Sequence, residues 1–559
     1  MLLKVDSIRK IYCDSNITAL DGVTFSMKEG EIIGMIGESG AGKTTLLKIL
    51  RGVEEFNDGR ICLDGMEITP SSPKGHFIDL QKKTAIQLQR NFSLWPDSAV
   101  DNVIRAIRFF DTGEETIPDC EGEYAEYRAK AIDILKIVGI DKRADLWSQV
   151  LSGGEKQRLV VARQIARKPK LLLLDEPGTM TCPATRQELI GALKKANKEL
   201  GMGIIFASHN PEIHRELTSR LLLIEGGRIA KDGKTSEVLD VFLSKLEKPE
   251  DKMTLNGPAV MKMEGVSKVY KMIPYGKVFE MFDTSLQFKR GEIAGIVGPS
   301  GAGKTIILRM LAGLELPDRG EVKIMHKNEW ITLGKLGRKS LHARTHIGIL
   351  HQEFDLSHWA KVLDLFAAQM GIKDTKMVED ALARAKVAGI NEEVVDALHR
   401  VAELPEGEMQ EKLREIGLDR EVLKDLFRSK DPEGAKDVAA AALKAMNLKT
   451  GILDRHVYEL SGGEKIRVAL ALAIISNPRV LILDEPFGDL DPITLRVVAN
   501  SLKKIKKLLK PAIVLVSHQV DLVEEVSDRG ILVLEGKVIM DGKPKEVIER
   551  FMEKDRDDL

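Results

Sequence analysis

The sequence predicts an α/β protein that contains two tandem copies of one domain. The first observation is that four short motifs occur twice and in the same order. The second is that each glycine-rich motif lies between a strand-like apolar run and a helix-like segment. The third is that each acidic pair ends a short, wholly apolar run, which is typical of a buried parallel strand. Each copy is therefore expected to carry a parallel sheet covered by helices.

The repeated motifs keep their spacing. The serine of the LSGGE motif precedes the first acidic residue by 23 residues in both copies, and that acidic residue precedes the histidine by 34 residues in both. Chance does not reproduce four motifs at matching intervals, so the chain is a tandem repeat. The pairs are GESGAGKT at 37–44 and GPSGAGKT at 298–305, LSGGEKQR at 151–158 and LSGGEKIR at 460–467, LLLLDEP ending at Pro177 and VLILDEP ending at Pro486, and FASH ending at His209 and LVSH ending at His518.

The stretch 246–258, LEKPEDKMTLNGP, separates the two copies. It is polar and contains Pro and Gly, which indicates a linker. We therefore expect a first domain over 1–245 and a second over 259–559.

The second copy is longer than the first. The interval from the glycine-rich loop lysine to the LSGGE serine is 109 residues in the first copy and 157 in the second, so the second carries 48 extra residues. The surplus falls mostly at 371–430, where Pro405 and Gly417 separate apolar residues at helical spacing. This pattern predicts about three extra short helices. The apolar positions are Val394, Leu398 and Val401, then Met409, Leu413 and Ile416, then Leu423, Leu426 and Phe427.

Composition excludes several classes of protein. The 559 residues include 84 Lys and Arg against 85 Asp and Glu, and a net charge of −1 argues against a strongly basic nucleic-acid-binding tail. No two cysteines form a CxxC pair, which argues against a disulfide framework or an iron–sulfur domain. No run approaches the length of a membrane span, and the N-terminus lacks a signal-peptide pattern, so we expect a cytoplasmic protein. The four cysteines are Cys13, Cys62, Cys120 and Cys182.

The glycine-rich motif GxxxxGK[ST] predicts a phosphate-binding loop. Its glycines let backbone N–H groups face phosphate oxygens, and the following helix offers its positive N-terminus to the same anion. Lys43 and Lys304 are expected to reach the β- and γ-phosphates, while Thr44 and Thr305 ligate Mg²⁺. The remaining nucleotide contacts are expected from Gly37, Ser39, Gly40, Gly42 and Thr45, and from Gly298, Ser300, Gly301 and Gly303.

The acidic pairs at the ends of the apolar runs suit hydrolysis. The carboxyl ends of parallel strands are where α/β sheets bind ligands. Asp175 and Asp484 are expected to hold Mg²⁺, usually through water, and Glu176 and Glu485 to polarise the attacking water.

The LSGGE motif, together with the phosphate-binding loop at this spacing, resembles the ATP-binding cassette family across both copies. The resemblance implies an ATP- and Mg²⁺-dependent ATPase. It also implies two nucleotide-binding domains, each with a RecA-like core and a helical subdomain. In that family two cassettes close head to tail, so that each ATP is gripped by the phosphate-binding loop of one cassette and the LSGGE of the other. The residues implied are Ser152, Gly153 and Gly154, and Ser461, Gly462 and Gly463.

The resemblance implies roles for three further pairs of residues. Gln89 and Gln352 match the switch glutamines that contact Mg²⁺, and His209 and His518 match the histidines that contact the γ-phosphate. Tyr12 and Tyr270 match the aromatic residues that stack on adenine, although an aromatic residue in a first strand is also a common core residue. Tyr275 is a competing candidate in the second copy.

One loop departs from the family pattern. After the acidic pair the second copy reads FGDLD and keeps Asp491, whereas the first reads GTMTC, with Cys182 at the corresponding position. Either the ATP site built on Lys304 with Ser152 is altered, or the substitution is tolerated. Because both glutamates and both histidines are present, we expect neither site to be wholly inactive.

The partner on which the ATPase acts has three candidate classes. Most cassettes of this kind are energy-coupling subunits of membrane importers. Ribosome-associated or DNA-repair tandem cassettes carry iron–sulfur, zinc or long charged elements that this chain lacks. The tandem arrangement and the unmatched insertion, which ends in LREIGLDREVLKDLF, resemble the ATP-binding proteins of the methyl-coenzyme M reductase activation system of methanogens. That resemblance implies ATP-dependent reductive activation of methyl-coenzyme M reductase, in company with the proteins of its activation complex.

Overall fold

The computed structural model describes residues 1–12, 17–88, 93–177, 183–255, 257–272, 276–299, 301–352, 356–488 and 490–557. The chain divides into two compact units between Leu246 and Glu247. Gln89, Cys182, Tyr275 and Ser300, which the sequence analysis singled out, lie outside the described residues.

The first unit contains a six-stranded sheet in the order β10-β9-β3-β8-β7-β6 and a four-stranded antiparallel sheet in the order β2-β1-β4-β5. The strands are β1 (Leu3–Tyr12), β2 (Ile17–Met27), β3 (Ile32–Ile36), β4 (Asp58–Leu63), β5 (Met66–Ile68), β6 (Thr84–Gln87), β7 (Leu171–Asp175), β8 (Gly203–Ala207), β9 (Arg220–Glu225) and β10 (Arg228–Lys234). The helices are α1 (Lys43–Arg51), α2 (Lys74–Lys83), α3 (Ala99–Thr112), α4 (Glu121–Ile137), α5 (Gly153–Ala166), α6 (Pro183–Leu200), α7 (Pro211–Leu217) and α8 (Thr235–Leu243).

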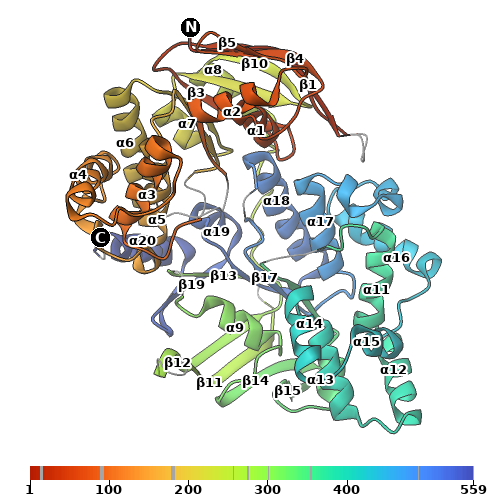
Figure 1. The fold of residues 1–559 in the computed structure, drawn as a ribbon. Helices are drawn as coiled ribbons and strands as arrows, with labels where there is room; N and C mark the ends of the chain where they lie inside the picture. Colours follow the sequence, from red (N-terminus) through yellow and green to blue (C-terminus); the bar gives the residue numbers. More distant parts are fainter. Residues whose placement is uncertain are drawn as a thin grey trace. The chain divides into compact units, whose positions relative to one another are not determined.

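The six-stranded sheet is parallel except for its edge strand β10. Every residue of β7 and of β8 is buried, as expected for strands covered on both faces. One hydrophobic core lies between this sheet and helices α3 to α6, and another lies between it and the antiparallel sheet. Helices α3 and α4 form the helical subdomain and appear in orange in Figure 1.

The second unit repeats this topology, with sheets ordered β16-β17-β18-β13-β19-β20 and β12-β11-β14-β15. The strands are β11 (Ala259–Met272), β12 (Gly276–Lys289), β13 (Ile293–Val297), β14 (Arg319–His326), β15 (Glu329–Thr332), β16 (Ile347–Leu350), β17 (Val480–Asp484), β18 (Ala512–Val516), β19 (Arg529–Leu534) and β20 (Lys537–Gly542). The helices are α9 (Lys304–Leu311), α10 (Arg338–Arg344), α11 (Val362–Lys373), α12 (Thr375–Val387), α13 (Glu392–Ala402), α14 (Glu406–Glu415), α15 (Arg420–Leu426), α16 (Pro432–Ala445), α17 (Gly462–Ala473), α18 (Pro492–Leu509), α19 (Val520–Val526) and α20 (Pro544–Asp557).

The insertion of the second unit contains four short helices, α12 to α15, where the periodicity predicts about three. The additional helix is α12. Its buried face carries two alanines beside Val378 and Leu382, so its apolar stripe is weak in the sequence. The four helices share a hydrophobic core of their own, to which α10 contributes Leu341. In Figure 1 they form one teal cluster beside α11.

A buried network of charged side chains joins the insertion to the cassette. Arg344 of α10 is fully buried and donates to Asp396 of α13 at 2.8 Å, and it also pairs with Glu403. Lys373 of α11 pairs with Glu403 and donates to Ile347 O at 2.6 Å. Burial would raise the pKa of Glu403, but the charges of Lys373 and Arg344 outweigh that effect and hold the pKa well below its ordinary value.

The predicted linker, residues 246–258, is bound to the second cassette. The side chain of Asn500, buried in α18, accepts from Glu250 N at 2.9 Å and donates to Lys248 O at 3.0 Å. Lys503 of the same helix donates to Glu250 O at 2.9 Å, and Arg290 N donates to Pro258 O at 2.9 Å. These bonds hold the linker against the second cassette.

None of the helices in the described part of the chain has the length and apolar content that crossing a membrane requires.

The buried network makes one prediction about stability. Glu403→Gln should leave Arg344 and Lys373 without their shared anion, which costs about 3–5 kcal/mol when one partner of a buried pair is removed. Denaturant unfolding of the whole chain should show the transition of the second cassette at a clearly lower midpoint. Glu421→Gln is the matched control, because it removes only an exposed pair with Lys424 and should cost less than about 1 kcal/mol. Equal midpoints for the two variants would contradict a structural role for the network.

Candidate functional site

The glycine-rich loop of the first cassette joins β3 to α1. Gly40 and Gly42 adopt φ of +83° and +103°, a region that side chains with a Cβ avoid. Gly37 is required for a different reason, because a Cβ there would lie only 2.2 Å from the carbonyl oxygen of Ile224 in β9. The loop therefore packs directly on the sheet and ends at the N-terminus of α1, the positive end that attracts anions.

The second cassette builds the same loop between β13 and α9. Gly301 and Gly303 adopt φ of +79° and +99°, and a Cβ on Gly298 would lie 2.1 Å from Val533 O in β19. A Cβ on Gly303 would lie 2.5 Å from the ring of Phe279, a residue that the sequence analysis did not select. Nothing in the pattern around Phe279 distinguishes it from an ordinary strand residue.

The loop lysines lie in equivalent positions. Lys43 Nζ donates to Gly37 O at 2.8 Å and Glu38 O at 3.0 Å, and Lys304 Nζ donates to Gly298 O at 2.9 Å and to Pro299 O at 2.7 Å. Burial lowers the pKa of both ammonium groups, and nearby carboxylates partly oppose that shift. In both cassettes a buried lysine ammonium group is thus held against the carbonyl groups of the glycine-rich loop.

The threonine after each lysine lies beside the first acidic residue. Thr44 Oγ1 donates to Asp175 Oδ2 at 2.8 Å, and Thr305 makes the equivalent hydrogen bond to Asp484. Burial raises the pKa of both aspartates. Asp484 Oδ1 is buried and lacks a hydrogen-bond partner among the described residues. Mg²⁺ prefers oxygen ligands, and each site offers it a hydroxyl oxygen and a carboxylate oxygen that can still accept. These residues could therefore hold that ion.

The second acidic residue of each pair lies just past the end of a strand in a strained backbone conformation. Glu176 and Glu485 have φ of +51° and +52°, which is uncommon for a residue with a side chain. Such strain is typical of residues at functional sites. Both carboxylates face the histidine that follows the next strand, β8 or β18.

The two glutamates differ in their contacts with the histidine. His209 Nδ1 lies 3.0 Å from Glu176 Oε1, and Ser208 Oγ donates to Glu176 Oε2 at 3.2 Å. In the second cassette His518 Nε2 lies 3.4 Å from Glu485 Oε1, and that oxygen has no hydrogen-bond partner among the described residues.

The difference in contacts produces opposite pKa shifts. Burial would raise the pKa of Glu176, but the hydrogen bond and charge of His209 outweigh it, so the pKa lies below its ordinary value. Burial raises the pKa of Glu485 to about 7, and the charge of Asp484 adds to that effect, while the hydrogen bonds from His518 N and Ser517 oppose it only in part. The two carboxylates are therefore not equivalent, although each is the glutamate of a DEP sequence.

Each LSGGE motif begins a helix with a complete capping box. Ser152 Oγ accepts from Glu155 N at 3.3 Å, and Glu155 Oε2 accepts from Ser152 N at 2.9 Å. Ser461 and Glu464 repeat the arrangement at 3.2 and 2.9 Å. The glycines form the first turn of α5 and α17: Gly153 and Gly154, and Gly462 and Gly463. A helix start without bulky side chains is suited to approach a phosphate.

The predicted adenine-stacking residues lie on the antiparallel sheets. Tyr12 ends β1, with Lys10 Nζ 4.7 Å from the centre of its ring. Tyr270 lies in β11, and its ring centre is 6.3 Å from that of Phe279. Both tyrosines are half-buried, so part of each ring remains accessible for stacking.

The switch glutamine of the second cassette, Gln352, is exposed just after β16. The residue before it, His351, donates from Nε2 to Glu403 O at 2.8 Å, because a carbonyl oxygen can only accept. The sequence analysis did not select His351, because a single histidine beside a strand carries no functional pattern.

Comparison with known proteins identifies the family. The ABC transporter family model matches residues 20–179 and 281–488, which is more than half of the chain. The chain therefore belongs to the ATP-binding cassette family and is a tandem-cassette ATPase that hydrolyses ATP.

Two relatives match the chain over its whole length. Both are uncharacterized ABC transporter ATP-binding proteins of Methanocaldococcus jannaschii. One is 43% identical and covers 98% of this chain and 97% of its own length, and the other is 30% identical and covers 100% and 98%. Among solved structures, the archaeal ribosome recycling factor aABCE1 in complex with ribosomal stalk protein aP1 matches 98% of this chain and 92% of its own, with a TM-score of 0.55 and 20% identity. That likeness concerns the fold.

The contact between Gly37 and β9 makes a prediction about binding. Gly37→Ala should push the loop away from Ile224 O and weaken ATP binding by about tenfold or more, since overpacking costs roughly 1–3 kcal/mol. Titration with a fluorescent ATP analogue of a chain that also carries Lys304→Ala, which removes the phosphate contact of the second loop, would measure binding by the first loop. Gly75→Ala is the matched control, because a Cβ there meets nothing within 4 Å. If Gly37→Ala binds as tightly as the control, the loop is not held by this contact.

Proposed function

We propose that this chain is an ATP-driven clamp, in which ATP binding draws the two cassettes together, hydrolysis releases them, and the motion acts on a separate client protein. The observation that carries this proposal is that each cassette contains the same set of contacts: a lysine bound to the glycine-rich loop, a threonine bonded to an aspartate, and a glutamate beside a histidine. A clamp needs two such sets, because in this family each ATP is bound between two cassettes.

In the proposed mechanism Lys43 and Lys304 bind the β- and γ-phosphates in place of their present carbonyl partners. Thr44 with Asp175, and Thr305 with Asp484, would hold Mg²⁺, which neutralises phosphate charge when it is bound. Gln352 would complete this set in the second cassette, and Gln89 would do so in the first.

Glu176 and Glu485 orient and polarise the attacking water in this mechanism. His209 and His518 contact the γ-phosphate and hold the glutamates in place. Because Glu485 has the higher pKa and the looser histidine, the second cassette is the one whose base requires further ordering when the clamp closes. Gly153 and Gly154, and Gly462 and Gly463, would contribute backbone N–H groups to the ATP held by the opposite cassette, and Ser152 and Ser461 would contribute their hydroxyl groups.

We infer that the client is methyl-coenzyme M reductase, acting with the proteins of its activation complex. Support comes from the resemblance of the tandem arrangement and the insertion to the ATP-binding proteins of that activation system. The insertion is the element that has no counterpart in the first cassette, so it is the natural docking element. In this role the chain contributes conformational work and not electrons.

A second candidate function is the energy-coupling ATPase subunit of a membrane importer. The observation that favours it is the family itself, since the matching model and both full-length relatives are described as ABC transporter proteins. Co-purification with an integral membrane permease, and ATPase stimulation by that permease in vesicles, would support this candidate against the first.

The assigned bases can be tested directly. The double variant Glu176→Gln with Glu485→Gln should lose ATP turnover yet keep ATP bound, because each amide retains the shape of the carboxylate without its charge. Steady-state phosphate release and retention of radiolabelled ATP on a desalting column would measure the two effects. Glu199→Gln with Glu433→Gln, two exposed positions, is the control. Hydrolysis at the unaltered rate in the double variant would exclude the base role.

The docking role of the insertion can be tested with a loop exchange designed from the internal repeat. Residues 374–431 are replaced by residues 113–120, which join the corresponding helices α3 and α4 in the first cassette. Arg344→Met and Lys373→Met accompany the exchange, because their buried anions are removed with the insertion.

The exchanged chain should hydrolyse ATP at the basal rate and lose binding to purified methyl-coenzyme M reductase, measured by interferometry at fixed nucleotide. The control is the chain with its insertion, Arg344 and Lys373 unaltered, because methionine at those positions would leave Asp396 and Glu403 buried without their cations. Undiminished binding after the exchange would show that the insertion is not the docking element.

A further inference from the structure

The two cassettes differ at a buried position five residues after the histidine that faces the glutamate base. The residue there is His214 of α7 in the first cassette and Val523 of α19 in the second. Both pack against the strand that leads into the glycine-rich loop. A Cβ on Gly34 of β3 would lie 2.5 Å from His214 Nδ1, and a Cβ on Gly295 of β13 would lie 2.4 Å from Val523 Cγ1. The two side chains therefore occupy equivalent places.

His214 is a neutral hydrogen-bond donor. Its ring is fully buried, and Nε2 lies 2.8 Å from Ser208 O, so Nε2 carries the proton because a carbonyl oxygen only accepts. Burial lowers the pKa of His214 to about 4, so the ring stays neutral near pH 7. Nδ1 has no hydrogen-bond partner among the described residues, and the ring packs edge-on against Phe206. The hydrogen-bonding capacity of this side chain is thus directed at Ser208.

Ser208 joins the end of β8 to His209, and it is held at three points. Its N–H donates to Met35 O at 3.1 Å, its Oγ donates to Glu176 Oε2 at 3.2 Å, and its carbonyl oxygen accepts from His214. A carbonyl group and the amide that follows it share one rigid plane, so fixing Ser208 O also fixes the start of His209. His209 keeps Nδ1 3.0 Å from Glu176 Oε1.

The second cassette lacks this support. Val523 has no N–H group to donate to the carbonyl of Ser517, the counterpart of Ser208. His518 turns Nε2 instead of Nδ1 toward Glu485 and lies 3.4 Å away. Its side chain is 39% exposed, against 15% for the histidine of the first cassette. The histidine is thus held less closely where the buried donor is missing.

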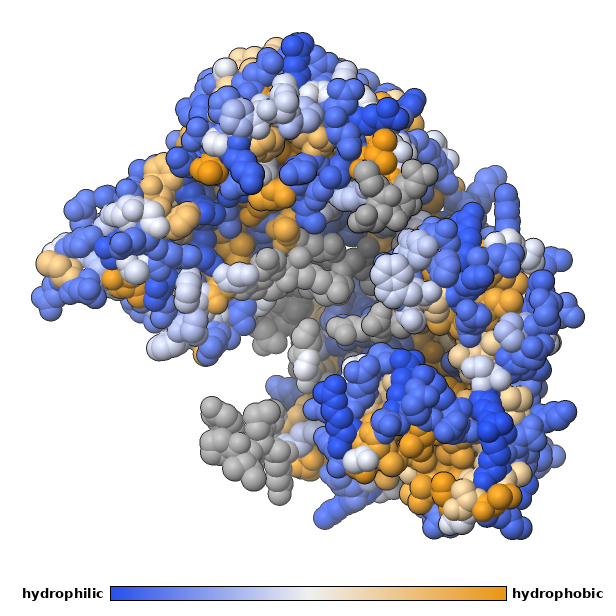
Figure 2. Space-filling view, turned by 45° about the vertical axis from the view of Figure 1, so that its right-hand side comes forward, coloured by the Kyte–Doolittle hydropathy of each residue, from blue (hydrophilic) through white to orange (hydrophobic). Residues whose placement is uncertain are grey.

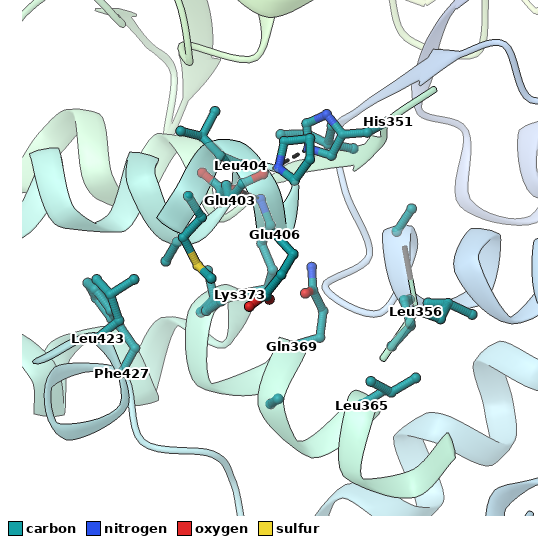
Figure 3. Close-up of a pocket in the computed structure, with 18 of the residues that line it drawn as sticks. His351, Leu356, Leu365, Gln369, Lys373, Glu403, Leu404, Glu406, Leu423 and Phe427 are labelled. Atoms are coloured by element: carbon teal, nitrogen blue, oxygen red, sulfur yellow. Dashed lines mark hydrogen bonds and ion pairs between the residues drawn. The ribbon is translucent and has the colours of Figure 1, made fainter. Parts of the chain in front are cut away.

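The more visible differences between the cassettes lie elsewhere. The insertion borders a cavity of about 450 Å³ in the second cassette (Figure 3), and the described residues that line it include neither His518 nor Val523. The surface in Figure 2 is mainly hydrophilic with scattered apolar residues, and His214 contributes nothing to a surface because it is fully buried. The exchange of His214 for Val523 is a difference within the segment that carries the histidine itself.

We propose that His214 is a positioning residue for hydrolysis in the first cassette, because it fixes Ser208 and thereby holds His209 against the glutamate base. This inference rests on the roles proposed above for His209 and Glu176. The second cassette has Val523 at this position, so its histidine reaches a working position only by other contacts.

The role is tested by steady-state ATP hydrolysis with the whole chain. His214→Val, which copies the second cassette, and His214→Met, which fills more of the space of the ring, both remove the donor. Because one buried hydrogen bond is lost, either should lower kcat by about fivefold if the cassettes hydrolyse in concert, and by about 1.5-fold if they contribute equally and independently. KM for ATP should not change, since Lys43 and its loop are untouched. An unchanged kcat in both variants would overturn the proposal.

Two further variants separate positioning from packing. His214→Gln places an amide N–H near the position of Nε2 and should restore most of the lost kcat. Ile213→Val trims a buried residue of the same helix without removing the hydrogen bond and should leave kcat unchanged. If Ile213→Val loses as much kcat as His214→Met, or if His214→Gln recovers none while the chain unfolds at an unchanged midpoint, His214 serves packing alone and the proposal is wrong.

Crystal structures of the unaltered and His214→Met chains without nucleotide test the geometry. The distance from His209 Nδ1 to Glu176 Oε1 should be longer in the variant, toward the looser contact of the second cassette. The same distance in both chains would overturn the positioning role. If Glu176→Gln alone leaves hydrolysis unaltered, the proposed base role is wrong, and this comparison still decides whether His214 holds His209.

Discussion

The close approach of a glycine to a strand carbonyl is the constraint on which each cassette depends. Gly37 lies against Ile224 O and Gly298 against Val533 O, with no room for a side chain at either position. Each contact fixes the glycine-rich loop to the strand that pairs with the strand before the loop: β9, which pairs with β3, or β19, which pairs with β13. With the loop fixed, the following helix points its N-terminus at the loop, and the lysine Nζ bonds to the loop's own carbonyl groups. The threonine reaches the aspartate that ends β7 or β17, two strands away from β3 or β13. Every other part of the site takes its position from this contact.

The same architecture nevertheless gives two unequal sites. Glu176 and Glu485 are each the glutamate of a DEP sequence and share the same strained backbone conformation. His209 approaches Glu176 with Nδ1 at 3.0 Å, whereas His518 approaches Glu485 with Nε2 at 3.4 Å, and a buried carboxylate is sensitive to each hydrogen bond that it accepts. Inequality between the cassettes is thus found at the glutamates, whereas Cys182, where the sequence pattern departs, lies outside the described residues.

Much of the fold could be predicted from the sequence, because motif spacing in a repeat constrains the position of each strand and helix. Motif spacing predicts three features in this way: the strand before each acidic pair, the helix after each glycine-rich loop, and the division of the chain into two tandem domains. The buried network of Arg344, Asp396 and Glu403 could not be predicted, because charged residues in a helical pattern ordinarily face solvent. Helix α12 was missed because its stripe is rich in alanine, and Phe279 and His351 were missed because a single residue carries no pattern.

The linker has a consequence for how the two cassettes meet. Because Asn500, Lys503 and Arg290 bind the segment between the cassettes to the second one, little of it is left as a free tether. A short tether gives its two ends a high effective concentration of each other. Encounter of the cassettes is therefore a first-order event whose rate does not depend on how much protein is present. A chain built in this way would respond to the supply of ATP and to the client, and would be insensitive to its own dilution.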